Sequence, residues 1–389
     1  MRKVNLLSCL LLSTLATAMP TLAVEIDLGA ASPYNAFLKN DFIVEGTDTQ
    51  GRIAVGGDFI IGGGNDIGYR IDEFGMGAGP SLVVGGSVIK NGSGSFNVYE
   101  AGAHQSPHSG EIVYAGQVLN NGTEITSTVS GQVEAKLTKV TSNNLPVDFD
   151  SAFNHLTALS DSLMSATTHG VGIKDNQRMG APLVFTPTTT PGDNVYVFNV
   201  TQEQVNANTD WFVEGVSDDA TVVFNISNEN NIAGNNNWKN YQCANGQVGC
   251  TQLSQVSVSI NGNLLSDHLN KGDLNNRLDN QVLFNFGNAT AVNISASVYG
   301  SILAPSADIK GVSGHVFGQI IGNSWESNMQ INYNPFTPVG TGTPPSATVP
   351  TPATIWIFLL ALSFAYINRN TMKTKRKANA PMFAESIAA

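Results

Sequence analysis

The feature that most constrains this chain is a short strand-and-glycine unit that recurs about every 30 residues. Residues 51–58, 81–87 and 111–117 each combine a β-branched run with a glycine-containing turn. Gly56, Gly85 and Gly116 are separated by 29 and 31 residues. A unit of this length covers its apolar face by stacking on its neighbours, so the period predicts a solenoid of stacked strands. Isolated β-hairpins would also show a strand followed by a glycine-containing turn, but they would not require a repeat of about 30 residues.

Other segments extend this interpretation. Strands are expected at 195–200, 221–226, 256–260 and 282–286, followed by a dense run of strands between 292 and 336. Residues 147–168 instead place Phe149, Phe153, Leu156, Leu159 and Leu163 at helical spacing, after acidic residues suited to an N-terminal cap. The predicted fold class is mainly β. It is a right-handed β-helix-like solenoid with one long amphipathic helix packed alongside.

The charge is distributed unevenly along the 389 residues. The whole chain carries a net charge of −11, but residues 24–352 hold 12 basic and 29 acidic residues, a formal charge of −17. An acidic body argues against a nucleic-acid partner, because phosphate binding requires a basic face. The 42% hydrophobic content excludes an ordinary disordered chain.

The N-terminus has the pattern of a secretory signal peptide. Arg2 and Lys3 precede an apolar run over residues 4–18, and small residues then lead to a predicted cleavage after Ala23. We therefore expect residues 1–23 to direct export through the inner membrane and then to be removed.

The C-terminus has three successive parts. A Gly/Thr/Pro linker over 340–352 leads to an apolar run over 354–367, which is shorter than a comfortable membrane span. A basic cluster and a cytoplasmic tail over 378–389 follow. Residues 349–377 are predicted to be either a short transmembrane anchor or a sorting signal. The residues assigned to this signal are Val349, Pro350, Pro352, Ala353, Arg369, Lys373, Lys375, Arg376 and Lys377.

This tail resembles the PEP-CTERM sorting signals of Gram-negative bacteria, although Thr351 stands where Glu is commonest. The resemblance implies recognition by an exosortase-type processing enzyme and a transient stay in the inner membrane. Its implied destination is the cell surface or the extracellular space.

Two cysteines remain after removal of the signal peptide. Cys243 and Cys250 flank a short loop, and in an exported protein such a pair is expected to form a disulfide. Two cysteines without a nearby histidine make a poor metal site.

Three features in one order resemble the choice-of-anchor A family, which is also described as ice-binding-like adhesive domains. They are residues 34–38 with 53–58, the central helix, and 299–305 followed by 314–322 and 334–336. The resemblance spans residues 31–336. It implies an adhesive β-solenoid domain, here residues 24–339, that is displayed on the cell surface.

No pattern indicates catalysis. The chain lacks the common hydrolase, zinc-protease and phosphate-loop motifs, and residues 62–66 are predicted to form a turn. His104 and His108 lie in a predicted loop. No cofactor is predicted. The weaker hypothesis of a structural Ca²⁺ involves the side-chain oxygens of Asp58, Asp66, Asp273 and Asp279.

The sequence therefore predicts a non-catalytic adhesive or biofilm-matrix protein, retained at the cell surface through its C-terminal tail. Its expected partner is a surface or matrix polysaccharide. The alternatives are a carbohydrate-binding or polysaccharide-active β-helix protein and, more weakly, an ice-binding protein. Ice binding is the weaker because Thr126, Thr128 and the threonines of 186–190 do not repeat at the strand period.

Overall fold

The computed structural model describes residues 25–71, 76–100, 110–206, 210–227, 243, 249–253, 257–266 and 278–338. The predicted signal peptide with Ala23, the linker and the entire C-terminal sorting signal lie outside these residues. His104, His108 and Asp273 also lie outside them.

The expected mainly β class is confirmed, and the strands of the described residues form four sheets. The largest sheet has 18 strands and curls, because the long strands β26 and β28 each pair in two of its layers. Its helix-facing layer contains β1 (Ala36–Leu38), β3 (Ile53–Val55), β6 (Leu82–Val84), β9 (Glu111–Tyr114), β13 (Lys136–Lys139), β14 (Gly170–Val171), β17 (Val195–Thr201), β19 (Thr221–Ser227), β23 (Val282–Asn285), β26 (Ser301–Gly311) and β28 (Ile320–Ser327). Its second layer contains β2 (Phe42–Val44), β4 (Phe59–Ile61), β7 (Val88–Lys90), β10 (Val118–Asn120), β11 (Thr123–Glu124), β20 (Cys250–Leu253) and β24 (Ala291–Ile294).

The other sheets form the remaining side of the molecule. Two three-stranded sheets contain β5 (Asn65–Ile67), β8 (Phe96–Val98), β12 (Val133–Glu134), β25 (Val298–Tyr299), β27 (His315–Phe317) and β29 (Gln330–Asn332). A five-stranded sheet contains β15 (Ile173–Lys174), β16 (Leu183–Phe185), β18 (Trp211–Val213), β21 (Val258–Ile260) and β22 (Asn263–Leu264). The α-helices are α1 (Phe149–Ser165) and α2 (Gln202–Asn206), and 3-10 turns cover Gly29–Ala31, Ser142–Asn144 and Leu278–Gln281.

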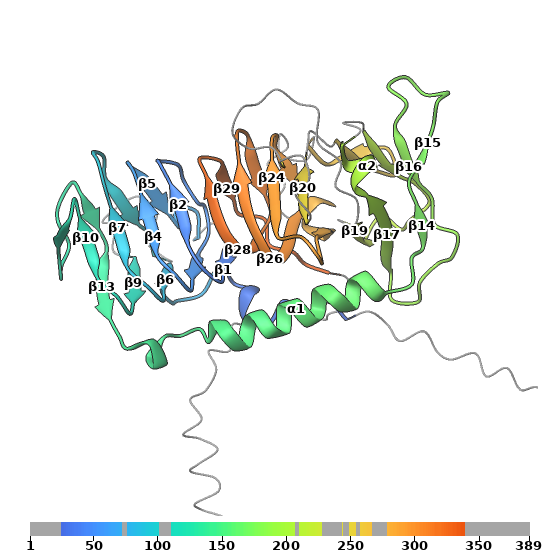
Figure 1. Ribbon diagram of the computed structural model, residues 1–389. Helices are drawn as coiled ribbons and strands as arrows, with labels where there is room; N and C mark the ends of the chain where they lie inside the picture. The colour runs from blue at the N-terminus through green and yellow to red at the C-terminus, as the bar shows by residue number, and fades with distance from the viewer. Residues whose placement is uncertain are drawn as a thin grey trace, which may run out of the picture.

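The chain does not follow the order of the stacked strands. It begins in the middle at β1 and adds β3, β6, β9 and β13 toward one end. Helix α1 then runs beneath the sheet to the opposite end, where β14 begins the second half (Figure 1). The second half returns through β17, β19, β23 and β26 until β28 pairs in parallel with β1. The two halves of the helix-facing layer therefore meet at one internal seam.

Glycines of the 30-residue unit stack in two adjacent columns, Gly85 over Gly56 and Gly116 over Gly86. β3, β6 and β9 pair in parallel, so the turns that follow them stack as well. A Cβ atom on Gly85 would collide with the Gly56 carbonyl oxygen, and one on Gly116 would meet that of Gly86. At Gly85 and Gly116 a side chain would therefore obstruct the backbone of the preceding turn, although the position over Gly85 itself holds Ala115.

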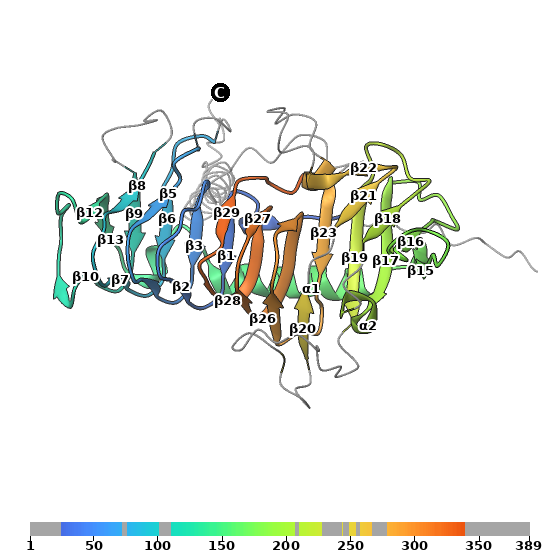
Figure 2. The same cartoon turned by 90° about the horizontal axis from the view of Figure 1, so that it is seen from above.

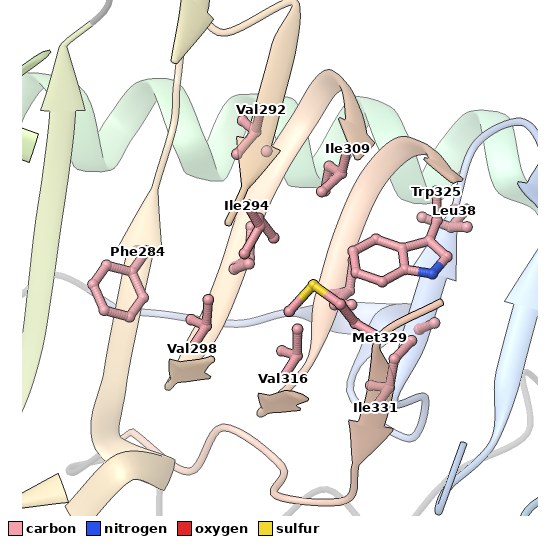
Figure 3. Close-up of a cluster of buried hydrophobic side chains, with 14 of the residues drawn as sticks. Leu38, Phe284, Val292, Ile294, Val298, Ile309, Val316, Trp325, Met329 and Ile331 are labelled. Carbon is pink, nitrogen blue, oxygen red and sulfur yellow. The ribbon is translucent and has the colours of Figure 1, made fainter. Parts of the chain in front are cut away.

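The interior between the layers is apolar. Leu38, Ile309, Trp325 and Ile331 are fully buried there with their neighbours from several strands (Figure 3). Phenylalanines also stack between successive strands, with the Phe42 and Phe59 ring centroids 5.0 Å apart. Continuous burial of this kind supplies the main stabilisation of a fold that has few helices.

Helix α1 covers the outer side of the helix-facing layer. Asp148 caps it by accepting a hydrogen bond from the Ser151 backbone N–H (3.0 Å). Near the other helix end, the Asn225 side chain donates to the Leu163 carbonyl (2.5 Å) and Asn285 donates to Asn225 (2.9 Å). These two asparagines are neighbours in the sheet register, so a buried polar ladder binds the helix to the second half of the sheet.

The prediction of a turn over residues 62–66 is wrong for its last two residues. Asn65 and Asp66 belong to strand β5, and the Asn65 side chain is buried. In the part of the chain that the structure describes, no helix has the length and apolarity needed to cross a membrane.

Helix docking gives a stability prediction. Phe37 is fully buried between the sheet and α1, with its ring 5.6 Å from Phe149 and 5.4 Å from Phe153. We expect Phe37→Ala to lower the free energy of unfolding by about 3–5 kcal/mol, because it leaves a cavity under the helix. Urea unfolding measures this value. The control Ile43→Ala, at a side chain that is 37% exposed, should cost under about 1 kcal/mol. Equal losses in the two variants would contradict this description of helix docking.

Candidate functional site

One side of the molecule carries a row of polar side chains that crosses six adjacent strand segments. Glu134 is paired with Asn97, and Asn97 with Asp66. Thr49 forms parallel β-bridges with both Ile67 and Ile331, so the preceding residue, Asp48, lies between Asp66 and Gln330. Gln330 is in turn paired with His315. Figure 2 shows the strands that carry most of it, β12, β8, β5, β29 and β27, side by side. We call Glu134, Asn97, Asp66, Asp48, Gln330 and His315 the polar row.

Strand alternation directs these side chains outward. Phe96, Val98 and Ile67 are fully buried in the interior, whereas Asn97 and Asp66 between them remain partly exposed. Neighbouring strands lie about 4.8 Å apart, so the row presents a hydrogen-bonding group at that repeat. The arrangement is an extended row of polar side chains that follows the stacking direction of the strands.

Asp66 is the centre of the hydrogen bonds in this row. One of its carboxylate oxygens accepts from the Asn97 side-chain amide (2.6 Å), and the other lies 3.5 Å from the Tyr99 hydroxyl. Its backbone N–H donates to the Asp48 carboxylate (3.1 Å). Burial, reinforced by the nearby Asp66 charge, raises the pKa of Asp48 above its ordinary value. Burial also raises the pKa of Tyr99 to about 12, so its hydroxyl remains protonated at neutral pH.

Aromatic groups border the polar row. The Tyr69 hydroxyl accepts hydrogen bonds from Gln330 (2.8 Å) and Gln50 (3.1 Å). Farther along, the Tyr299 and Phe317 rings stack with centroids 5.0 Å apart, and the His315 ring lies 5.8 Å from Phe317. Carboxylates, amides and phenols therefore occur together with apolar ring surface on this side.

The other two sides differ in character. Helix α1 covers one of them. The sheet residues that point outward on that side, such as Phe37, Val83 and Leu303, are therefore buried. The remaining side presents Ile43, Ile60, Ile89 and Leu119, which are paired in register on β2, β4, β7 and β10. We call these four residues the aliphatic row.

The structure places the predicted site residues in structural roles. Cys243 and Cys250 form a disulfide, with their sulfur atoms 2.04 Å apart. The Asp58 carboxylate accepts from the Ser87 backbone N–H (2.7 Å) at a corner between strands, away from Asp66. Asp279 falls in a 3-10 turn. Sequence reasoning missed the polar row as a unit, although a polar residue between two apolar ones in 65–67 and 96–98 is a signal that could have found it.

Two further features limit what the site can do. Within the described ranges, no three His, Cys, Asp or Glu side chains lie close enough to hold a metal ion. A hollow of about 330 Å³ lies away from the polar row, at one end of the molecule, and is lined by Ile173, Lys174, Asp175, Val184 and Thr186. The polar row itself is extended and lies outside this hollow, which suits an extended partner.

The comparison with protein families agrees with this geometry. A family model described as an ice-binding-like adhesive domain matches residues 27–333. The chain belongs to this family. The family is described as adhesive and ice-binding-like, and proteins of this kind are typically extracellular or at the cell surface.

Solved structures of low sequence identity are also similar to this chain. An ice-binding protein from an Antarctic biological consortium is 13% identical (TM-score 0.31), over 79% of this chain and 89% of that one. An ice-binding protein from the ascomycete Antarctomyces psychrotrophicus is 11% identical (TM-score 0.27), over 80% and 98%. A Shewanella frigidimarina ice-binding protein domain is 9% identical (TM-score 0.30), over 79% and 97%. No protein of curated function matches the chain.

The raised pKa of Asp48 gives a pH prediction. Because folding makes this carboxylate harder to ionise, its charge destabilises the folded protein at neutral pH, and the penalty disappears as the pH falls and the group is protonated. Asp48→Asn keeps an acceptor for the Asp66 N–H but removes the charge, so we expect a higher Tm at pH 7. The gain should shrink toward zero near pH 3, where Asp48 is neutral in both folded and unfolded chains. Thermal unfolding at the two pH values measures it, and a lower Tm at pH 7 would contradict the assignment.

Proposed function

We propose that this chain is an exported, non-catalytic adhesin that is retained at the cell surface and binds a neutral, hydroxyl-rich polysaccharide through its polar row. The family supports the adhesive role. The location rests on the predicted signal peptide and the predicted C-terminal sorting signal, and includes processing by an exosortase-type enzyme.

The proposed body is a right-handed β-helix-like solenoid with α1 packed along it. The parallel register of most neighbouring strands supports this description, the antiparallel pairs being β10 with β11, β15 with β16 and β21 with β22 in the described residues. A solenoid suits an adhesin, because each added strand extends a rigid flat surface by one repeat. The disulfide between Cys243 and Cys250 fits a protein that works outside the cytoplasm.

The observation that carries the proposed ligand is the polar row itself. Its carboxylates and amides accept and donate hydrogen bonds at a regular spacing, and sugar hydroxyls supply the complementary donors and acceptors. Glu134, Asp66 and Asp48 make the row acidic, so it would repel an anionic polymer. Single contacts of this kind are weak, and a polymer gains affinity by occupying several of them at once.

Binding of purified full-length chain to insoluble neutral glucan particles tests this proposal. We expect Asp66→Ala to reduce the association constant about tenfold, because it removes charge-assisted hydrogen bonds worth roughly 1.5 kcal/mol. Pull-down with a concentration series measures the change, and circular dichroism verifies that the variant is folded.

Glu326→Ala is the matched control. Glu326 is a half-exposed carboxylate next to the aliphatic row and is paired with Lys310 (2.6 Å), so its loss should leave glucan binding unchanged. Stronger binding to anionic alginate than to neutral glucan would contradict the proposal. Equal losses in the two variants would also contradict it.

Ice binding is the second candidate, and the aliphatic row favours it. Ile43, Ile60, Ile89 and Leu119 present methyl groups in a flat, regular line. If this row bound ice, the wild-type chain would show thermal hysteresis and Ile60→Asp would abolish it. Thermal hysteresis that survives Ile60→Asp but is lost in Asp66→Ala would instead assign ice to the polar row.

The predicted sorting tail gives a separate experiment. Deletion of residues 349–389 should release the protein from the cells into the medium, because the apolar run and the basic cluster are then absent. Cell fractionation with immunoblotting measures the distribution. The matched control deletes only residues 378–389, which follow the basic cluster, and should leave the protein cell-associated. An unchanged distribution after the longer deletion would contradict retention through the tail.

A further inference from the structure

We propose that the polar row binds an extended, neutral β-1,4-linked glycan that lies along the stack of strands, with one sugar over each strand. The inference rests on the proposed function and names the class of polysaccharide. Its grounds are the direction of the row, the spacing of its members and the aromatic residues beside it.

The polar row runs across the strands. Glu134, Asn97 and Asp66 come from three neighbouring strands that are paired in register. Along a single strand the next residue points inward instead, as the fully buried Ile67 does after Asp66. A ligand that contacts several members of the row must therefore follow the stacking direction, and cannot lie along one strand.

Hydrogen bonds link members of the row in the same direction. The Asn97 amide donates to the Asp66 carboxylate on the neighbouring strand (2.6 Å), and the Asp66 backbone N–H donates to the Asp48 carboxylate (3.1 Å). Farther along, the His315 backbone N–H donates to the Ser297 hydroxyl (3.1 Å). Each carboxylate can accept further bonds from sugar hydroxyls, because its two oxygens have about four lone-pair positions. Groups held in place in this way lose less conformational freedom when a ligand binds.

The strand spacing sets the length that each sugar must cover. Neighbouring strands lie about 4.8 Å apart, so the six members of the row span about 24 Å. Equatorial 1,4-linkages keep a β-glycan extended, and each of its sugars advances by nearly the strand spacing. Chains with α-1,4 or β-1,3 linkages curl, so their successive sugars would turn away from the row. The match in length therefore favours the extended β-1,4-linked class.

The aromatic residues suit the same class. Tyr99 and Phe317 each follow a member of the row, Asn97 or His315, by two residues, and both are partly exposed. The Tyr99 hydroxyl lies 3.5 Å from the Asp66 carboxylate, so this ring is on the same side as the row. The sugars of a β-1,4-glycan carry their hydroxyls at the ring edges and apolar C–H groups on the ring faces. The row can bind the hydroxyls while the aromatic residues contact the C–H groups.

Isothermal titration calorimetry of the full-length chain, in a detergent without sugar groups, tests the proposal with cellotetraose and cellohexaose. We expect the association constant to be about tenfold higher for cellohexaose, because its two additional sugars reach further members of the row. Laminarihexaose and maltohexaose have the same number of sugars but β-1,3 and α-1,4 linkages. They should bind at least about tenfold more weakly than cellohexaose.

Variants at the two ends of the row test the direction of the ligand. Glu134→Ala and His315→Ala change members that lie about 24 Å apart. Each should weaken cellohexaose binding at least about threefold and leave cellotetraose binding nearly unchanged, because the inner members hold the shorter ligand. Glu326→Ala is the matched control and should change neither ligand's binding. Circular dichroism verifies that the variants are folded.

Three results would overturn the inference. They are cellohexaose binding no tighter than cellotetraose, laminarihexaose binding as tightly as cellohexaose, and full cellohexaose binding in both end variants. If Asp66→Ala still lowered binding in any of these cases, the proposed function would stand and only the glycan class or its direction would be wrong. Absence of Asp66-dependent binding to every neutral glycan would overturn both proposals.

Discussion

The structure depends on the seam where β1 pairs with β28, because this contact joins strand residues that are 284 positions apart in sequence, such as Ala36 and Ile320. The Asn35 side chain donates to the Gly318 carbonyl (2.8 Å), and that of Asn40 donates to Asn323 (2.8 Å). The buried Gln319 side chain adds a bond to the Tyr34 carbonyl (2.8 Å). Without the seam, each half of the helix-facing layer would end in an exposed edge. The seam is formed by the two ends of the domain, so the stack closes only when both halves are in place.

Helix α1 and the seam together determine which surfaces are free. The helix connects the two outer ends of the stack, covers one side with residues such as Phe153, and is bound by the asparagine ladder at Asn225 and Asn285. Among the described residues, no helix covers the sides that carry the polar row and the aliphatic row (Figure 1). Both rows are regular because the strands that carry them are regularly spaced. The two rows differ chemically because each strand segment contributes one outward side chain to its row, polar in one and aliphatic in the other.

The sequence predicted the elements of this fold more fully than their arrangement. The spacing of Gly56, Gly85 and Gly116 predicted strands that do stack in register, because Gly85 lies against Gly56 and Gly116 against Gly86, where a Cβ would collide with the backbone. The start of the chain in the middle of the stack was not predictable, because no local pattern records that Ala36 pairs with Ile320. The polar row was missed for the same reason. Asp66, Asn97 and Gln330 are ordinary polar residues until the register brings them into one line.

Carboxyl footprinting of the chain bound to glucan particles tests the central claim, adhesion through the polar row, most directly. A water-soluble carbodiimide labels accessible Asp and Glu side chains, and mass spectrometry then reads each site. Binding should protect Asp66 and Glu134 from labelling, while Glu326 beside the aliphatic row should label equally in bound and free protein. Protection of Glu326 with continued labelling of Asp66 and Glu134 would contradict the claim.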